Sequence, residues 1–238
     1  MKQYLYLQVA DELQKEIDGN VYNVHQKLPS ETELAKHFNI SRLTLRKAIE
    51  ALEKRQVVVK DRNRGTYALA TTNKISSGAD GLSGFTEVAK KMNLRPETQV
   101  LQLKTVTKYP AVVTESLRLV EHEPLWRIER LRLVNEAPMT HEQIYIRQTT
   151  LPDLDATQAT GSLYELIEAH TQIAYASQEL EAIQLPEHIS ELLAVAAGSP
   201  AFLAHTVAFS VDGYPILYDD SYYRSDKYTF HNILYRHH

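Results

Sequence analysis

Two arginines, Arg130 and Arg132, stand two positions apart within residues 126–134, a segment typical of a β-strand. Side chains two apart on a strand leave the same face of the sheet, so both guanidinium groups point the same way. Their planar forks suit a phosphate or a carboxylate. Glu142, across the expected hairpin, can accept hydroxyl hydrogen bonds, and Ser162 at a helix start offers a hydroxyl and free N–H groups. Together these residues predict a pocket for a small phosphorylated polyol.

Ion pairing inside the sheet is an alternative interpretation of the same arginines. Two like charges on one face repel unless an anion lies between them, and Glu129, Glu142 or Glu115 can supply that anion. The residues alone leave the two interpretations equally supported.

A second set of polar residues lies near the N-terminus. Arg42 and Arg46 are four apart in a helical pattern and therefore share a face, with Thr44 beside them. The buried stripe of the same helix is formed by Leu45, Ala48, Ile49 and Leu52. A helix with one buried face and one basic face can enter the major groove of DNA.

The segments around this helix favour the same chemistry. Ser30 and Ser41 are expected N-caps whose helix ends and hydroxyls can meet phosphates. Arg62 and Arg64 flank a tight turn in which Gly65 permits close approach of the backbone to DNA. Helices over residues 5–17, 31–38 and 42–52, followed by strands 57–59 and 66–69, predict a winged helix-turn-helix over residues 1–70.

The remainder of the chain predicts an α+β unit. Residues 71–83 are polar and read as a linker. Beyond them, helices are expected over 85–92 and 162–169, and a turn at 135–138 joins two antiparallel strands. A mainly antiparallel sheet over residues 84–238 is therefore expected, with its strands at 99–106, 126–134, 139–146, 175–183, 201–210 and 216–224.

Composition and charge limit the classes of protein. The 238 residues are 43% apolar and 24% charged and contain no cysteine, which excludes disulfides and thiolate chemistry and favours a reducing compartment. Neither a signal-peptide core nor an apolar run near ~18 residues occurs, so we expect a cytoplasmic protein with no membrane partner. Residues 1–70 carry 12 basic and 9 acidic side chains, whereas residues 71–238 carry 14 and 21. Only the N-terminal unit is expected to meet a polyanion.

An enzyme is the competing class. Ser162, His141 and Glu142 supply the residue types of a catalytic triad, but no Gly-x-Ser-x-Gly elbow occurs, and adjacent strand residues face opposite ways. The histidines lack the His-Glu-x-x-His spacing of a metal site. We therefore expect no catalytic residues, no metal and no cofactor.

A set of motifs spans residues 4–69: Lys27-Leu28-Pro29-Ser30-Glu31, Leu34-Ala35, Phe38, Ser41-Arg42, Thr44-Leu45-Arg46, Ala48 and Arg64-Gly65-Thr66-Tyr67. This signature resembles the N-terminal domain of GntR-family transcription regulators. The resemblance implies that Arg42, Thr44 and Arg46 contact operator DNA, with the wing around Gly65 in the minor groove.

A second set of motifs covers most of residues 84–230: Gly84-Phe85-Thr86-Glu87, Ile128-Glu129-Arg130-Leu131-Arg132, Pro138, Glu142, Ser162-Leu163-Tyr164 and Tyr223-Arg224-Ser225-Asp226-Lys227-Tyr228. These resemble the UTRA effector domain of the HutC subfamily. The resemblance implies a chorismate-lyase-like fold without lyase activity, a homodimer formed through this domain, and a sensor role.

The resemblance also implies which residues bind the effector. In relatives that sense sugar phosphates, the phosphate is held at positions matching Thr86, Arg130, Arg132 and Ser162, whereas positions matching Glu142 and Tyr223 touch the sugar. Phe85 and Tyr164 belong to the matched motifs and are assigned to the same pocket. Leu217 stands where amino-sugar-sensing members carry Glu, which argues against an amino sugar. The expected protein is a repressor of a carbohydrate uptake or catabolism operon, released by a phosphorylated sugar; the alternative is a DNA-binding regulator whose C-terminal domain only dimerises or binds a non-sugar carboxylate.

Overall fold

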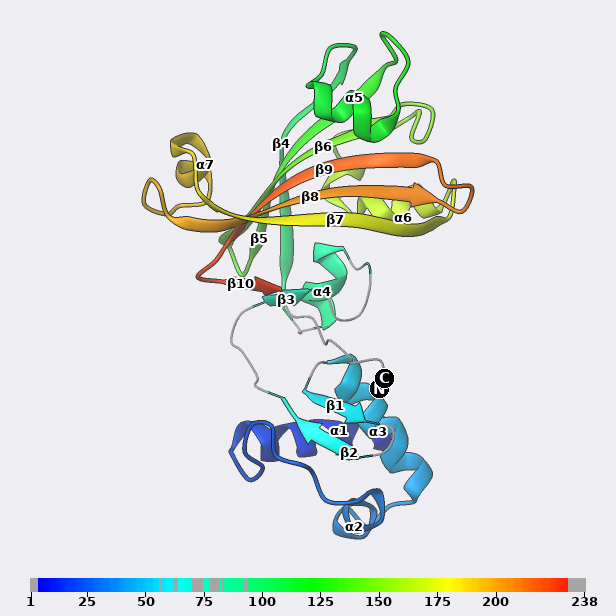
Figure 1. The fold of residues 1–238 in the computed structure, drawn as a ribbon, viewed down its shortest axis with the longest axis vertical. Coiled ribbons are helices and arrows are strands. Elements are labelled where there is room, and N and C mark those ends of the chain that lie inside the picture. The colour runs from blue at the N-terminus through cyan, green and yellow to red at the C-terminus, as the bar shows by residue number, and fades with distance from the viewer. Residues whose placement is uncertain are drawn as a thin grey trace. The chain divides into compact units, whose positions relative to one another are not determined.

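The computed structural model describes residues 4–55, 57–61, 64–69, 75–77, 82, 84–91 and 94–230 (Figure 1). The chain divides into two compact units, residues 1–73 and residues 74–238. Each unit has its own core, and each is described by itself.

Three helices form most of the first unit: α1 (Leu5–Asp18), α2 (Glu31–His37) and α3 (Arg42–Lys54). α2 begins with a capping box, in which the Ser30 hydroxyl accepts from the Glu33 N–H at 3.3 Å and the Glu33 carboxylate accepts from the Ser30 N–H at 2.8 Å. Ser41 caps α3 by accepting from the Thr44 N–H at 3.1 Å. The sequence predicted both caps, and the short connection between α2 and α3 makes the helix-turn-helix.

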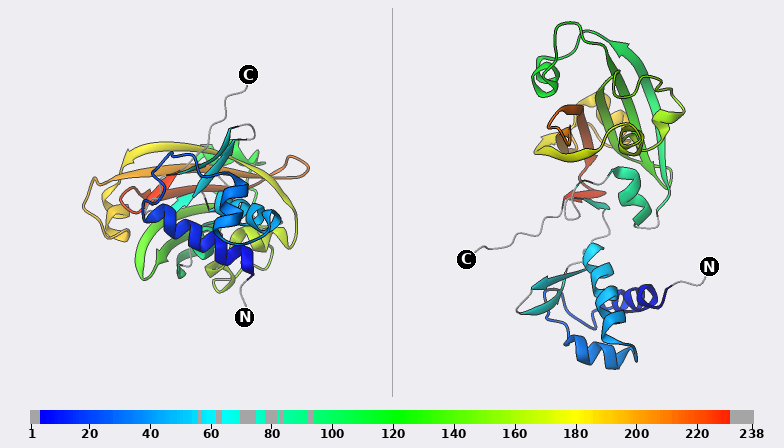
Figure 2. Two further views of the ribbon diagram at one scale, coloured as in Figure 1. Left: turned by 90° about the horizontal axis from the view of Figure 1, so that it is seen from below. Right: turned by 90° about the vertical axis from the view of Figure 1, so that its right-hand side faces the viewer.

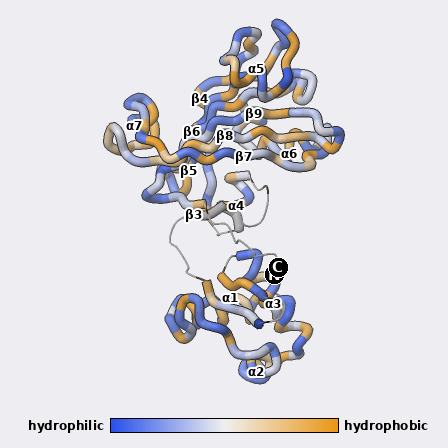
Figure 3. Tube along the Cα trace, viewed as in Figure 1, coloured by the Kyte–Doolittle hydropathy of each residue, from blue (hydrophilic) through white to orange (hydrophobic). Residues whose placement is uncertain are grey.

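The core of the first unit lies between these helices and a small hairpin. β1 (Val58–Asp61) pairs antiparallel with β2 (Gly65–Ala68). Colouring by hydropathy shows apolar and polar residues alternating along α1 and α3, which is the pattern of helices buried on one side (Figure 3). The apolar side of each helix is fully buried; its main members are Val9, Leu13, Leu34, Leu45, Ile49 and Leu52.

A six-stranded antiparallel sheet dominates the second unit. Its strands are β4 (Pro96–Val106), β5 (Leu125–Val134), β6 (Ala137–Arg147), β7 (Ile173–Gln184), β8 (Pro200–Ser210) and β9 (Pro215–Arg224), in the order β4-β5-β6-β9-β8-β7. Val134 pairs with Ala137, so the β5–β6 turn contains only Asn135 and Glu136, with φ of 49° and 67°. Two central residues with positive φ define a type I′ turn, which is tighter than the expected four-residue turn.

Helices cover both faces of this sheet. α6 (Leu163–Glu168) and the 3₁₀ turn η1 (Gln158–Thr160) pack on the face that carries Ile144 and Ile146. α5 (Ala111–Leu117) packs on the opposite face against Tyr145, and α7 (Glu187–Leu192) packs there against Leu131 and Leu133. Figure 2 shows these helices on a strongly twisted sheet. The sequence predicted α6 but neither α5 nor α7.

A small additional layer lies at one end of the sheet. α4 (Phe85–Lys91) packs against β3 (Ile75–Ser77), and β3 pairs in parallel with β10 (Tyr228–Phe230). The β3 residues lie inside the stretch expected to be a linker, and they belong to the second unit. Of the helices that the structure describes, none has the length and apolar character to cross a membrane.

Candidate functional sites

The exposed face of α3 carries the basic residues that the sequence placed there. The side chains of Arg42 and Arg46 are 60% and 51% exposed, while Leu45 and Ile49 on the other face are buried. The hydroxyl of Thr44 lies 2.8 Å from that of Ser41 at the start of the helix. α3 therefore presents two exposed guanidinium groups and a hydroxyl on one side, the arrangement expected of a helix that enters the major groove.

One carboxylate organises the cations of this face. Glu31, the first residue of α2, accepts a hydrogen bond from Arg46 Nε at 2.7 Å and lies 3.6 Å from Arg42 and 3.3 Å from Lys60 on β1. The hydrogen bond from Arg46 lowers the pKa of Glu31 despite opposition from partial burial. Sequence reasoning assigned Glu31 to the family signature but gave it no role. The position of Glu31 at the start of α2, next to the expected basic helix, is the feature of the sequence from which this pairing with Arg42 and Arg46 could have been predicted.

The hairpin supplies fewer described groups than expected. Arg64 is exposed, and Gly65 has φ of 116°, which a residue with a side chain rarely adopts. A Cβ at Gly65 would also lie 2.7 Å from the Lys27 side chain, so the glycine has a structural reason within the unit. Arg62, the other expected wing residue, lies outside the described residues.

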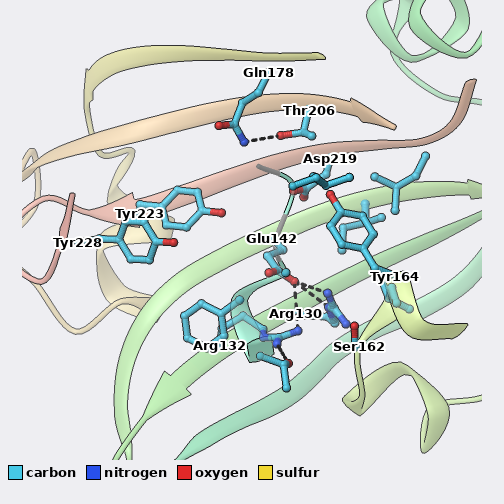
Figure 4. A pocket seen from close by; sticks show the side chains of 17 residues that line it. Arg130, Arg132, Glu142, Ser162, Tyr164, Gln178, Thr206, Asp219, Tyr223 and Tyr228 are labelled. Carbon is cyan, nitrogen blue, oxygen red and sulfur yellow. Dashed lines mark hydrogen bonds and ion pairs between the residues drawn. The ribbon is translucent and has the colours of Figure 1, made fainter. Parts of the chain in front are cut away.

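The second unit contains a pocket on the α6 face of the sheet. It encloses about 690 Å³, the space at its open mouth included. All eight residues expected to bind an effector line it: Phe85, Thr86, Arg130, Arg132, Glu142, Ser162, Tyr164 and Tyr223. They come from α4, β5, β6, β9 and the start of α6, segments that are far apart in the chain (Figure 4).

Arg130 is fully engaged within the protein. Its guanidinium bonds Glu142 at 2.8 and 2.6 Å and donates to the carbonyl oxygens of Ala159 and Gly161, both at 3.1 Å. These bonds tie β5 to β6 and to the segment before α6. The ion-pairing interpretation of the sequence thus holds for Arg130, with Glu142 as the anion.

Arg132 is buried but has fewer partners. Its guanidinium donates to the Thr86 hydroxyl at 2.5 Å, stacks on the Phe85 ring at 4.8 Å and lies 3.8 Å from Glu142. The side chain is only 2% exposed, and its buried Nε has no hydrogen-bond partner. Burial lowers the pKa of Arg132. Such a cation is poised to bind an anion.

Glu142 carries a negative charge between the two arginines. Burial alone would raise its pKa, but the adjacent Arg130 and Arg132 hold the pKa below its ordinary value. With Glu142 ionised, the cluster of two arginines and one carboxylate keeps one net positive charge. Ser162 adds a hydroxyl at the edge of the cluster; its oxygen accepts from the Glu165 N–H at 3.3 Å, so its proton remains available to a ligand.

The end of the pocket away from the arginines is lined by an amide, a hydroxyl and a carboxylate. Gln178 on β7 donates to Thr206 on β8 at 3.0 Å, and Asp219 on β9 lies near them (Figure 4). Leu217 also lines the pocket, as the sequence argument about amino sugars requires. Sequence reasoning missed Gln178, Thr206 and Asp219, because their contribution depends on the pairing of β7, β8 and β9.

The residues of the imagined triad are not assembled. His141 lies on the opposite face of the sheet from Glu142, where its Nε2 is 3.0 Å from Glu129. Burial lowers the pKa of His141. Among the residues that the structure describes, no group of three or more His, Asp or Glu side chains is arranged to hold a metal ion.

Comparison with known proteins identifies both units. Residues 5–68 match the family described as bacterial regulatory proteins, gntR family, and residues 91–229, more than half of the chain, match the UTRA domain. The chain therefore belongs to the GntR family of DNA-binding transcription regulators, in the arrangement with a C-terminal UTRA domain that characterises the HutC subfamily. Its members are regulators and not enzymes.

Individual relatives extend over the whole chain. The HTH-type transcriptional repressor NagR of Bacillus subtilis is 27% identical over 238 residues, covering 98% of this chain and 95% of that protein. The mannosyl-D-glycerate transport/metabolism system repressor MngR of Escherichia coli is 25% identical, covering 98% and 96%. The crystal structure titled "possible transcriptional regulator YydK", from Bacillus subtilis, has a TM-score of 0.66 at 20% identity, covering 99% and 100% of the two chains, and shows the same fold.

Proposed function

We propose that the protein is a cytoplasmic, homodimeric repressor of a carbohydrate uptake or catabolism operon, released from its operator by a small phosphorylated sugar. The observation that carries the proposal is Arg132, a buried cation with an unpartnered Nε at the wall of an open pocket. The ligand's phosphate would take the place beside Arg132, Thr86 and Ser162. Glu142 and Tyr223 would accept and donate hydrogen bonds to the sugar.

The names of two relatives also support a repressor of a carbohydrate operon. NagR and MngR are both named as repressors, and the name of MngR refers to the transport and metabolism of mannosyl-D-glycerate. A dimer offers two α3 helices to a palindromic operator, whose half-sites would lie about one helical turn apart, since the DNA repeat fixes their spacing.

A thermal-shift screen against sugar phosphates tests the effector half of the proposal. A ligand at 100 times its dissociation constant stabilises the unit it binds by about 2.7 kcal/mol. We expect a stabilising sugar phosphate whose effect is lost in Arg132→Ala and kept in Arg127→Ala. Arg127 is a matched control, because it lies on the same strand but faces away from the pocket, where it bonds Gln102 at 2.9 Å.

The screen also separates the alternatives. Stabilisation by non-sugar carboxylates alone would favour a carboxylate sensor, and a pocket indifferent to every anion would favour a domain that only dimerises. Equal loss of stabilisation in Arg132→Ala and Arg127→Ala would contradict the assignment of the phosphate to Arg132.

For the DNA half, Arg46→Ala should weaken operator binding in an electrophoretic mobility assay and leave sugar phosphate binding intact. The side chain is half exposed on α3, so its loss removes a groove contact without disturbing the core. Unchanged operator affinity would refute the role of α3.

A further inference from the structure

Asp219 is a carboxylate in the pocket that forms no ion pair with the residues that the structure describes. It lies on β9 on the same face as Leu217 and Tyr223, and it lines the pocket. Its Oδ2 accepts from the Ser221 hydroxyl at 2.7 Å, while its Oδ1 is buried without a hydrogen-bond partner. Burial, reinforced by the negative charge of Glu142, raises the pKa of Asp219 well above its ordinary value. A buried carboxylate of this kind is costly unless something binds it.

The pocket places this carboxylate away from the arginines. In Figure 4, Glu142 lies between Asp219 on one side and Arg130 and Arg132 on the other. The strand register agrees: Arg130 pairs with Glu142, Glu142 pairs with Ser221, and Asp219 is two residues further along β9. At ~4.8 Å between strands and ~3.4 Å per residue, the backbones of Arg130 and Asp219 are about 12 Å apart. A small ligand can therefore touch both ends through side chains that reach inward.

Two neutral hydrogen-bonding side chains accompany Asp219. The Gln178 amide donates to the Thr206 hydroxyl, which leaves the carbonyl oxygen of Gln178 as an acceptor at this end of the pocket. The pocket therefore has hydrogen-bond acceptors at the Asp219 end and a surplus positive charge at the arginine end. It suits a ligand that carries a hydrogen-bond donor or a positive charge at one end and an anionic group at the other.

Leu217 and Asp219 together change the argument about amino sugars. Leu217 cannot accept a hydrogen bond, which is why the sequence alone argues against an amine. Residues two apart on a strand share a face, so Asp219 offers the same pocket the carboxylate that Leu217 lacks, displaced by about 7 Å along β9.

We propose that Asp219, with Gln178 beside it, forms a second subsite that binds a protonated amine. The effector is then a phosphorylated sugar that carries an amine at the end remote from the phosphate. This inference rests on the proposed function, which assigns the phosphate to Arg132. An ammonium group satisfies Oδ1 of Asp219 and supplies the positive charge that the empty pocket lacks there.

Pairs of sugar phosphates that differ only by an amine in place of a hydroxyl test the subsite. We would titrate the full chain by calorimetry with glucosamine 6-phosphate against glucose 6-phosphate, and with 1-amino-1-deoxyfructose 6-phosphate against fructose 6-phosphate. In at least one pair, the amine should bind tenfold tighter or more to the unmodified chain. N-acetylglucosamine 6-phosphate, which has no charge on nitrogen, should lose that advantage.

Variants then locate the preference. Asp219→Asn keeps the size of the side chain and should reduce the preference for the amine to less than twofold. Asp220→Asn is the matched control: it is the next residue on β9, faces the opposite side of the sheet and bonds His205 at 2.6 Å, so it should keep the preference. Asp219→Ser provides a second variant if the asparagine protein does not fold.

The outcomes distinguish this inference from the proposed function. Binding of plain sugar phosphates through Arg132 with no preference for any amine would overturn the amine subsite alone. A preference that survives in Asp219→Asn would do the same. If neither plain nor aminated sugar phosphates bind, the proposed function fails and the amine subsite fails with it.

Discussion

At the scale of single residues, Arg130 and Arg132 show how identical side chains on one face take different roles. Arg130 donates hydrogen bonds to Glu142 and to two backbone carbonyl oxygens, so it links β5 to β6 and to the segment before α6. Arg132 retains an unpartnered Nε and contacts Thr86 and Phe85 from α4, so we expect it to be the cation that meets a ligand. Residue spacing predicted both arginines, and only their partners separate them.

Glu31 is expected to tune DNA binding by restraining Arg42, Arg46 and Lys60. Glu31→Gln removes one negative charge from among these three cations. We expect tighter binding to non-operator DNA and a smaller ratio of operator to non-operator affinity. Because each phosphate contact contributes about −0.9 to the slope of log affinity against log salt, the slope for non-operator DNA should steepen by up to about one contact.

Fluorescence anisotropy across a salt series measures both effects, with Glu33→Gln on the same helix as a control that affects the cap of α2 but not these cations. An unchanged salt slope in Glu31→Gln would show that Glu31 does not restrain the basic face.

Asp219 should reduce the stability of the empty protein at neutral pH. Its pKa is raised in the fold, so the folded chain binds more protons than the unfolded chain above the unfolded value of about 3.9, and stability falls as pH rises through that window. Asp219→Asn removes this loss. The melting temperature of the variant should therefore exceed that of the unmodified chain at pH 8, and the difference should shrink towards pH 4.

Differential scanning calorimetry between pH 4 and pH 8 provides the measurement, with Asp220→Asn as the control on the opposite face. If Asp219→Asn melts at a lower temperature than the unmodified chain at pH 8, Asp219 stabilises the empty protein, and the prediction that its ionised form lowers stability is wrong.

At the scale of elements, the β5–β6 hairpin sets the register that brings Arg130 opposite Glu142. Its two turn residues have positive φ, and Glu136 occupies the position with φ of 67°, where a side chain costs roughly 1–2 kcal/mol. Glu136→Gly should relieve that strain and stabilise the second unit by up to about 1 kcal/mol, since the greater freedom of glycine in the unfolded chain offsets part of the gain.

Urea unfolding followed by the single tryptophan, Trp126 on β5, measures the change. Glu136→Val is the contrasting variant, because a β-branched residue disfavours positive φ and should destabilise the turn. Equal stability of the glycine and valine variants would contradict the type I′ assignment.

The elements also show what sequence reasoning can reach. Local signals predicted the caps of α2 and α3, the hairpin strands and the helix after Ser162, because each depends on neighbouring residues. α5 and α7 are short and begin after Pro110 and Pro186 without a side-chain cap, so their local signals are weak. The β3–β10 pair joins residues about 150 positions apart, which no local pattern reveals.

The sequence also predicted part of the lining of the pocket in the second unit. Spacing and resemblance placed eight residues in one pocket, and the structure brings all eight there. Spacing could not reveal that Glu142 would bond Arg130 more fully than Arg132, nor that Asp219 would form no ion pair among the described residues. Both facts depend on which strands become neighbours in the sheet.

At the scale of the whole molecule, the chain combines a basic DNA-binding unit with an acidic UTRA unit. The first 70 residues carry a net charge of +3 and the remainder −7. We therefore expect the GntR unit to make the contacts with DNA phosphates, and operator affinity to fall with added salt. If the proposed function holds, effector and operator bind to different units of one chain, and each must change the affinity of the other.

Reciprocal binding measurements test this coupling most directly. Operator DNA would be selected by the protein from a random-sequence library, and the effector would be the sugar phosphate that stabilises the chain most. By thermodynamic linkage, saturating effector should weaken operator binding about 5- to 150-fold, and operator should weaken effector binding by the same factor. Arg132→Ala should bind operator normally and show no response. Operator affinity that stays unchanged at saturating effector would contradict release of the protein from its operator by that effector.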